Sequence, residues 1–378
     1  MAGEKDMRVF RGIRYARAEM FGRPVQEDFP EEFDFDGYAA ESVVCPQTPS
    51  RLSRILGDIS NKLPMSFDCL RVSIFTPDLS GSRPVLVFFH GGAYLTGSGE
   101  YDCYDASRLA GEGDIVVVNV SYRLGASGFL YQPDKGSVDL GIEDQMCALR
   151  WVKANIARFG GNAEDLTLCG QSAGAYSVLN IIARQTGLFN KAIIMSAPFA
   201  LRPNRKKALR MRDTFFESLE NQDVPSFLAA QQKAQEVGQV GMPFMPMEEQ
   251  VFFKADSVPG LTEVMLTYQK DDASAFVSGK IQNRIGTSFI FKSPLYRYAR
   301  HLEKKGVKAR VIEFDWHPKG NRLGACHTLE LPFLFGAWEN WKDAPMLAGT
   351  SKEEYEARGR ELRKILVSFV RPRGFGGV

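Results

Sequence analysis

The chain has 378 residues, of which 44% are hydrophobic and 24% are charged, and its 47 Lys and Arg residues nearly balance its 45 Asp and Glu residues. This composition excludes an intrinsically disordered chain and a strongly basic nucleic-acid-binding protein. Its longest apolar runs, such as Pro84–Phe89 and Ile115–Val120, are much shorter than the ~18 residues of a membrane-spanning helix, so no membrane span is expected.

The amino-terminal residues lack the apolar stretch of a secretory signal. We therefore expect a cytoplasmic protein, with secretion as the alternative if a signal peptide has been removed. Six scattered cysteines are too few for a disulfide framework, and no Cys or His spacing is typical of a metal site. The sequence predicts neither a metal nor a cofactor.

Up to about residue 200, short β-branched runs alternate with helical periodicity, which is typical of βαβ units. The nearly continuous apolar runs predict strands buried on both faces of a mostly parallel sheet, with helices on both sides. The predicted elements here are a strand at Val85–Phe89, a helix at Asp105–Ala110, a strand at Val116–Val120, a helix from Asp144 to about Phe159, a strand at Leu166–Leu168, a helix at Ala173–Arg184 and a strand at Ala192–Ser196.

The middle of the chain, Arg202–Glu249, is rich in charge, Gln and Met and predicts a mainly helical insertion or cap, extending over approximately residues 202–260. Beyond it the sequence predicts a strand at Val264–Thr267, a helix at Pro294–Lys305, a strand at Ala309–Phe314 and a closing helix at Lys352–Phe369.

The strongest functional motif is Gly170-Gln171-Ser172-Ala173-Gly174, which has the pattern Gly-x-Ser-x-Gly between a predicted strand and a predicted helix. That setting predicts a nucleophile elbow, a strained turn that projects the Ser172 hydroxyl above the sheet. His90-Gly91-Gly92 directly follows another predicted strand, where an α/β-hydrolase supplies backbone N–H groups to its oxyanion hole. We interpret His90 itself as bracing the loop.

A serine nucleophile needs a histidine base, which a carboxylate holds in the correct tautomer. The chain has four histidines. His301 lies on a predicted helix and is expected to be solvated, whereas His317 follows a predicted strand. Since α/β-hydrolases order their triad as Ser, acid, His, the pattern favours His327 as the base and leaves His317 as the alternative.

Together these motifs resemble the type-B carboxylesterase and cholinesterase family of α/β-hydrolases. The resemblance runs from the amino terminus to about Pro198 and resumes near Ser288. Its motifs are Phe10–Ala16, Asp68-Cys69-Leu70, His90-Gly91-Gly92, Ser121–Gly125, Asp144-Gln145, Phe159–Asn162, Gly170–Gly174 and Gly324–Gly336. The resemblance implies one α/β-hydrolase catalytic domain over residues 1–378, with a cap region reduced relative to most family members.

The resemblance implies Ser172 as nucleophile and His327 as base. For the oxyanion hole it implies the backbone N–H groups of Gly91, Gly92 and Ala173.

The acid is harder to place from the sequence. The family usually has Glu in an Asn-x-Asp-Glu-Gly stretch, and Tyr268–Ala273 occupies that place here. We predict Asp272, with Asp271 as the alternative and another carboxylate if both are solvated.

The resemblance also concerns three further features. Gln171 stands where the family usually has Glu, a change that leaves the elbow's geometry intact. Cys45 and Cys69 match cysteines that are bonded in secreted relatives, and whether they are bonded here stays open. Ser196 resembles a family serine near the triad, and we interpret it as a core hydroxyl satisfied by the backbone.

The implied activity is cofactor-independent hydrolysis of a small-molecule carboxylic ester through an acyl-enzyme, as in a carboxylesterase. An amidase, lactonase or acyltransferase would use the same machinery. The alternative from another class is a non-catalytic binding or scaffold protein, as in family members that have lost the triad. The sequence predicts no nucleic-acid partner and leaves the oligomeric state open.

Overall fold

The computed structural model describes residues 7–60, 62–135, 139–247, 251–255 and 257–371. Within these residues, eight strands form one sheet in the order β1-β4-β6-β5-β7-β8-β9-β10. β1 and β4, and β4 and β6, pair antiparallel, and the other neighbours pair parallel. The strands are β1 (Arg8–Arg14), β4 (Arg71–Thr76), β5 (Arg83–Phe89), β6 (Val116–Val120), β7 (Gly161–Gln171), β8 (Lys191–Met195), β9 (Glu263–Gln269) and β10 (Lys308–Phe314), with the small pair β2 (Ala16–Arg17) and β3 (Val25–Gln26) apart from them. The predicted α/β fold with a mostly parallel sheet is confirmed.

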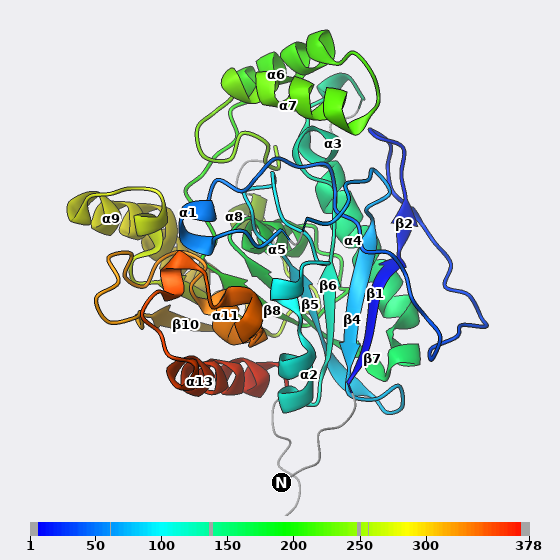
Figure 1. The fold of residues 1–378 in the computed structure, drawn as a ribbon, viewed down its shortest axis with the longest axis vertical. Helices are drawn as coiled ribbons and strands as arrows, with labels where there is room; N and C mark the ends of the chain where they lie inside the picture. Colours follow the sequence, from blue (N-terminus) through cyan, green and yellow to red (C-terminus); the bar gives the residue numbers. More distant parts are fainter. Residues whose placement is uncertain (1–6, 61, 136–138, 248–250, 256, 372–378) are drawn as a thin grey trace, which may run out of the picture.

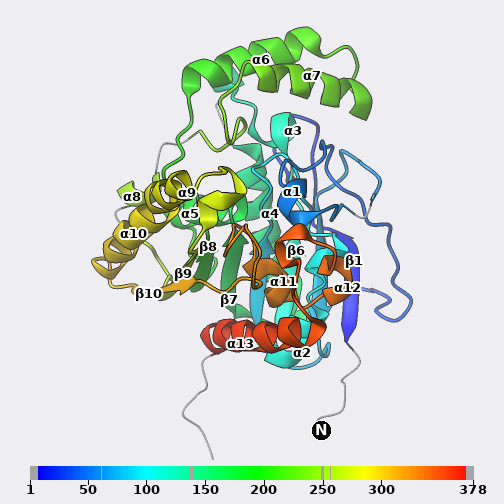
Figure 2. The same cartoon turned by 60° about the vertical axis from the view of Figure 1, so that its left-hand side comes forward.

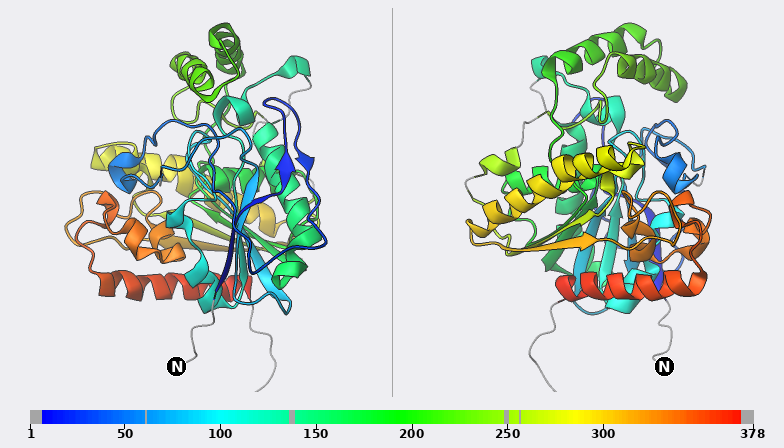
Figure 3. Two further views of the ribbon diagram at one scale, coloured as in Figure 1. Left: turned by 45° about the vertical axis from the view of Figure 1, so that its right-hand side comes forward. Right: turned by 90° about the vertical axis from the view of Figure 1, so that its left-hand side faces the viewer.

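Helices lie on both sides of this sheet (Figure 3). They are α1 (Ser53–Leu56), α2 (Ser107–Gly113), α3 (Gly125–Phe129), α4 (Leu140–Asn155), α5 (Ala173–Ala183), α6 (Arg205–Ser218), α7 (Val224–Glu236), α8 (Val251–Lys254), α9 (Lys280–Gly286), α10 (Ser293–Glu303), α11 (Glu330–Phe335), α12 (Trp338–Trp341) and α13 (Lys352–Val370). Shorter turns are η1 (Asp102–Tyr104), η2 (Pro133–Lys135), η3 (Ile156–Phe159), η4 (Asp272–Ala275), the π-helix η5 (Thr287–Lys292) and η6 (Pro345–Leu347).

Two hydrophobic cores lie on the two faces of the sheet, because successive side chains of a strand point to opposite faces. In β5, Val85, Val87 and Phe89 belong to the core beneath α4, α5 and α10, whereas Leu86 and Phe88 belong to the core beneath α2, α11 and α13. This two-sided burial explains why β5 and β6 are apolar without alternation.

The predicted elements are found with shifted ends. β6 has the predicted bounds, but β7 begins five residues before the predicted Leu166, and α4 begins four residues before the predicted Asp144. Gly160, with φ 75°, ends η3 in the left-handed conformation expected of that turn. The strand predicted at Ala192–Ser196 ends one residue earlier, at Met195, and Ser196 has the left-handed φ of 49°.

The described part of residues 202–260 contains the helices α6, α7 and α8 and no strand. That this region is an insertion or cap stays a prediction. Figures 1 and 2 show α6 and α7 packed together at one end of the molecule, away from the sheet. Residues 248–250 and 256 of the predicted insertion, and both ends of the predicted 1–378 domain, lie outside the described residues. The single-domain assignment therefore stays a prediction.

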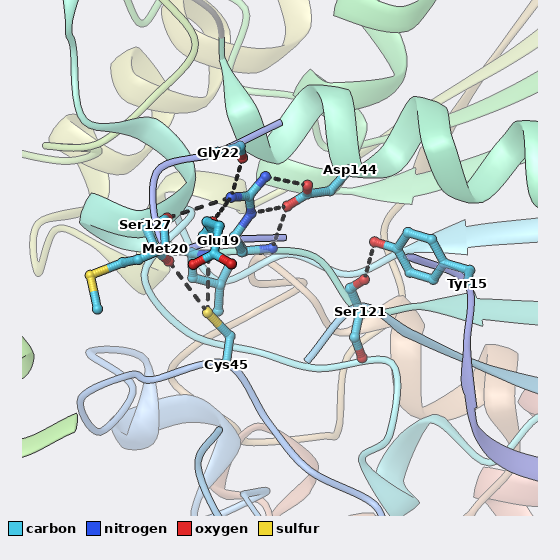
Figure 4. A network of polar contacts seen from close by, with 10 residues as sticks. Tyr15, Glu19, Met20, Gly22, Cys45, Ser121, Ser127 and Asp144 are labelled. Carbon is cyan, nitrogen blue, oxygen red and sulfur yellow. Dashed lines mark hydrogen bonds and ion pairs between the residues drawn. The ribbon is translucent and has the colours of Figure 1, made fainter. Parts of the chain in front are cut away.

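A buried ion pair joins the amino-terminal segment to α4 and to the loop after β6 (Figure 4). The Arg123 guanidinium donates to both carboxylate oxygens of Asp144 on α4, at 2.8 and 2.6 Å, and to the carbonyl oxygens of Glu19 and Gly22. Both charged side chains are almost completely buried. Two of the sequence motifs, Ser121–Gly125 and Asp144-Gln145, thus meet in the fold.

In the part of the chain that the structure describes, no helix has the length and apolar character needed to cross a membrane.

Candidate active site

The turn between β7 and α5 has the geometry of a nucleophile elbow. Ser172 lies between the two elements with φ 57° and ψ −119°, a conformation that non-glycine residues rarely adopt. A Cβ atom on Gly170 would lie 2.3 Å from the Gly174 carbonyl oxygen, and one on Gly174 would lie 2.0 Å from that of Phe89. Both glycines are therefore required for strand, turn and helix to pack this closely. The amino-terminal end of α5, where the helix dipole is positive, begins directly after Ser172.

A buried histidine and carboxylate meet beside this turn. His327 Nδ1 lies 2.7 Å from Asp272 Oδ1, and both side chains are buried. The other carboxylate oxygen, Asp272 Oδ2, accepts hydrogen bonds from the Ser196 hydroxyl at 3.0 Å and from the Gln269 backbone N–H at 2.8 Å. The expectation that the Ser196 hydroxyl would hydrogen-bond to the backbone was therefore wrong, because this hydroxyl donates to the Asp272 carboxylate.

Asp271 points elsewhere. Its Oδ1 accepts from the Asn283 side chain at 2.9 Å, and its Oδ2 accepts from the backbone N–H of Ala325 at 3.1 Å. The Asp271 backbone N–H also donates to the Ala325 carbonyl oxygen. Asp271 thus holds the loop that precedes His327, whereas Asp272 contacts the imidazole itself.

The face of His327 is enclosed by apolar and polar neighbours. The rings of Phe276 and Phe291 lie 5.3 and 5.4 Å from the imidazole ring, measured between centroids. On the other side, Gln171 Nε2 lies 3.5 Å from His327 Nε2. With Nδ1 directed at Asp272, Nε2 is the ring nitrogen turned toward the elbow.

The glycine loop after β5 lies against the elbow. A Cβ atom on Gly91 would lie 2.9 Å from the Gln171 carbonyl oxygen and 3.1 Å from the Ser172 Cβ, so only glycine fits this close to the elbow without a shift. Gly92 has φ 107°, and a Cβ there would lie 2.0 Å from the Thr96 carbonyl oxygen. Gly91 and Gly92 thus line the cavity next to Ser172, and Ala173 directly follows the serine as the first residue of α5.

The other histidines are placed away from this pair. His90 stacks on Tyr122, and its Nδ1 lies 2.8 Å from the Gly91 carbonyl oxygen, as expected for a residue that braces the loop. Burial lowers the pKa of His90 to about 4. The exposed His317 contacts the carbonyl oxygen of Pro318. His301 was expected to be solvated, but it is half-buried and stacks on Tyr298.

Glu330 was not among the predicted site residues. It lies three residues after His327 and is the first residue of α11. Its side chain is buried and accepts from Gln269 Nε2 at 2.5 Å. Burial, followed by the nearby charge of Asp272, raises the pKa of Glu330 to about 8. The sequence signal that could have found it is a carboxylate three residues after the candidate base, at the first residue of a helix.

A cavity of about 340 Å³ opens in front of Ser172. Gly91, Gly92 and Gln171 form its wall next to the serine. The opposite walls are mostly apolar, and they come from the segment around α1, from the loop after Gly97 and from α11. These apolar residues are Val44, Leu52, Leu56, Ile59, Leu63, Met65, Tyr101, Tyr104 and Leu331. The cavity suits an apolar group attached to a reacting carbonyl.

Cys45 and Cys69, whose bonding the sequence left open, are buried free thiols in the structure. Contact with the Cys45 thiol and burial raise the pKa of Cys69. Cys45 Sγ also accepts from the Leu124 backbone N–H at 3.2 Å, next to Ser127 (Figure 4).

Comparison with known proteins gives consistent matches. The model of the carboxylesterase family matches residues 1–278. A protein of Rhodococcus erythropolis, named as a probable N-octanoylanthranilate hydrolase, is 35% identical over 97% of this chain and 89% of its own length. The phenmedipham hydrolase of Pseudarthrobacter oxydans is 28% identical over 97% of this chain and 87% of its own. The solved structure of a PNB esterase matches with a TM-score of 0.82 and 26% identity, over 97% of this chain and 87% of that one.

Proposed function

Because this chain belongs to the carboxylesterase family and is an ester-hydrolysing enzyme, we propose that Ser172 is its nucleophile, His327 its general base and Asp272 the carboxylate that orients His327. We therefore propose ester hydrolysis as the activity, in preference to the alternative of a non-catalytic scaffold protein. The observation that carries the proposal is the buried 2.7 Å contact between His327 Nδ1 and Asp272 Oδ1, beside a serine held at φ 57°.

In the first half of the reaction, the Ser172 Oγ attacks the ester carbonyl carbon and its proton passes to His327 Nε2. The backbone N–H groups of Gly91, Gly92 and Ala173 stabilise the resulting oxyanion, with each donor contributing about 3 kcal/mol. The tetrahedral intermediate then expels the alkoxide, which takes the proton from His327. The acyl group stays on Ser172 as an ester.

In the second half, His327 removes a proton from water, and the resulting hydroxide attacks the acyl-enzyme. Collapse of the second tetrahedral intermediate releases the carboxylic acid and returns the proton to Ser172. Asp272 makes three hydrogen-bond contacts, with His327, the Ser196 hydroxyl and the Gln269 backbone N–H, which hold its carboxyl group in place beside the imidazole.

The apolar cavity in front of Ser172 supports esters with an apolar acyl or alcohol part as substrates. A second candidate function is hydrolysis of N-acyl aromatic amines, which the name of the Rhodococcus relative motivates. Both reactions proceed through the same acyl-enzyme, so the leaving group distinguishes them.

The test is hydrolysis of a series of p-nitrophenyl esters, from acetate to long acyl chains, with an octanoyl anilide in parallel. Ser172→Ala should abolish turnover of every substrate that the parent hydrolyses. Asp272→Asn should lower kcat by about 10³-fold to 10⁴-fold, because it gives the imidazole the wrong tautomer.

Asp271→Asn is the matched control, because this neighbour supports a loop and does not touch the imidazole. It should retain activity within about tenfold of the parent, an order-of-magnitude expectation for one supporting hydrogen bond. Equal losses in the two asparagine variants would contradict the assignment of Asp272. Turnover by Ser172→Ala at the parent's rate would remove Ser172 as the nucleophile.

A further inference from the structure

One side of the molecule exposes large apolar side chains on a helical segment. Ile281, Ile285 and Phe289 are 74%, 62% and 69% exposed, and they recur every four residues along α9 and η5. This spacing places them on one face of the helix. Figures 1 and 2 show α9 at the side of the molecule, away from α6 and α7.

The same face is strongly basic. A hollow of about 720 Å³ beside the three apolar side chains has three arginines in its described walls, Arg202, Arg284 and Arg297, and no carboxylate. Although the whole chain has a net charge of only +2, residues 280–305 contain seven Lys and Arg residues and one Glu. We call the six residues Arg202, Ile281, Arg284, Ile285, Phe289 and Arg297 the basic apolar face.

The positive charge of this face indicates which kind of partner can bind to it. A symmetric dimer through the face would bring its arginines against their own copies, and like charges in contact oppose association. The arginines of this face therefore favour an anionic partner over a second copy of the chain. The apolar side chains project into solvent with more than half of their surface exposed, so a fluid apolar layer would bury them without a shape-matched groove.

We propose that the basic apolar face binds the surface of an anionic lipid bilayer, with the isoleucines and Phe289 inserted at the level of the headgroups and the arginines on lipid phosphates. Apolar side chains flanked by Arg and Lys are the pattern by which helices lie in a membrane interface. The proposal concerns peripheral binding by α9 and η5 and requires no membrane-spanning helix.

The position of the face gives lipid binding a consequence for the site. The segment that bears it begins after Phe276 and includes Phe291, and the rings of both phenylalanines contact His327. A bilayer bound at this face would therefore lie near the candidate active site. Apolar esters dissolved in the bilayer would be concentrated next to the enzyme.

Flotation with vesicles tests the proposal. The parent protein is mixed with vesicles of phosphatidylcholine alone, or of phosphatidylcholine with phosphatidylglycerol. We expect binding to the anionic vesicles, weakened by added salt because the attraction to the lipid phosphates is screened. The double variant Ile285→Asp/Phe289→Asp and the double variant Arg284→Glu/Arg297→Glu should each bind at least about tenfold more weakly, because each places two acidic side chains against the anionic lipids.

Val240→Asp is the matched control, because Val240 is 97% exposed but lies outside the basic apolar face. It should bind as the parent does. All variants should show the same thermal unfolding midpoint by circular dichroism, so that loss of binding is not loss of folding. Ser172→Ala should also bind like the parent, which makes this test independent of the proposed catalytic residues.

Three results would overturn the proposal: no binding of the parent to anionic vesicles, binding of the parent to neutral vesicles as strong as to anionic ones, or binding by both double variants as strong as the parent's. A dimer of the parent that is lost in Ile285→Asp/Phe289→Asp, without any vesicle binding, would assign the face to a second copy of the chain instead.

Discussion

At the scale of single residues, the buried carboxyl of Glu330 makes the stability of the protein depend on pH. Burial and the charge of Asp272 raise its pKa to about 8, well above the ~4.3 of an unfolded chain. Between these two values the folded protein holds a proton that the unfolded chain has lost. The free energy of unfolding therefore falls as pH rises through this window, by up to about 1.4 kcal/mol per pH unit.

Glu330→Gln should remove this dependence, because the amide is neutral at every pH and has the same shape. Below the pKa of an unfolded glutamate, the variant and the parent should be about equally stable. Approaching pH 8, the variant should become the more stable protein. Urea unfolding at a series of pH values measures the difference, and Glu339→Gln on the exposed surface serves as the control. Parallel pH profiles for parent and Glu330→Gln would mean that Glu330 is ionised in the fold.

At the scale of elements, the Arg123 and Asp144 pair joins the loop after β6 to α4 and to the segment Glu19–Gly22. Arg123→Met should lower the free energy of unfolding by about 3–5 kcal/mol, because it leaves the Asp144 carboxylate buried without its cation. The double variant Arg123→Met/Asp144→Asn should recover part of that loss, since the neutral amide costs less to bury.

Denaturant unfolding measures the free energy of unfolding of both variants. The matched control is Arg358→Met, which breaks the exposed pair of Arg358 with Glu361 and should cost less than about 1 kcal/mol. If the double variant is as unstable as Arg123→Met, the loss comes from the carbonyl oxygens of Glu19 and Gly22 and not from the unpaired carboxylate.

The elements also show what the sequence could predict. β5 and β6 could be predicted because both of their faces are buried, which leaves a nearly continuous apolar run that only Asn119 interrupts in β6. β1 was missed because, at the edge of the sheet, it carries the partly exposed residues Arg8, Arg11 and Arg14 between its buried ones. Because β1 buries only one face and contains Gly12, its sequence shows neither a continuous apolar run nor a regular alternation of apolar and polar residues.

The candidate site likewise has a part that the sequence could predict and a part that it could not. The elbow around Ser172 is encoded by five adjacent residues, so its local geometry could be predicted. The contacts of Asp272 with Ser196 and of Gln269 with Glu330 join residues 76 and 61 positions apart. No local sequence pattern predicts these contacts, because they depend on which strands become neighbours in the sheet.

At the scale of the whole molecule, the two cores share one sheet, and α13 closes the second of them. Arg363 on α13 is buried and donates to both carboxylate oxygens of Glu112 on α2, at 2.7 and 2.9 Å. It also donates to the carbonyl oxygen of Phe333 on α11 at 2.7 Å. One guanidinium therefore joins three helices that cover the same face of the sheet.

Arg363→Met should lower the free energy of unfolding by about 2–4 kcal/mol, because a buried carbonyl oxygen loses its donor and Glu112 loses its ion pair. Since α11 follows His327 and carries Glu330, loss of this core should also disassemble the candidate site. Because β5 contributes to both cores, we expect the first core to unfold with the second. The urea midpoints for circular dichroism and for esterase activity should therefore fall together, whereas Lys364→Met on the exposed face of α13 should shift neither. Activity that persists through a first circular-dichroism transition would show instead that the two cores unfold independently.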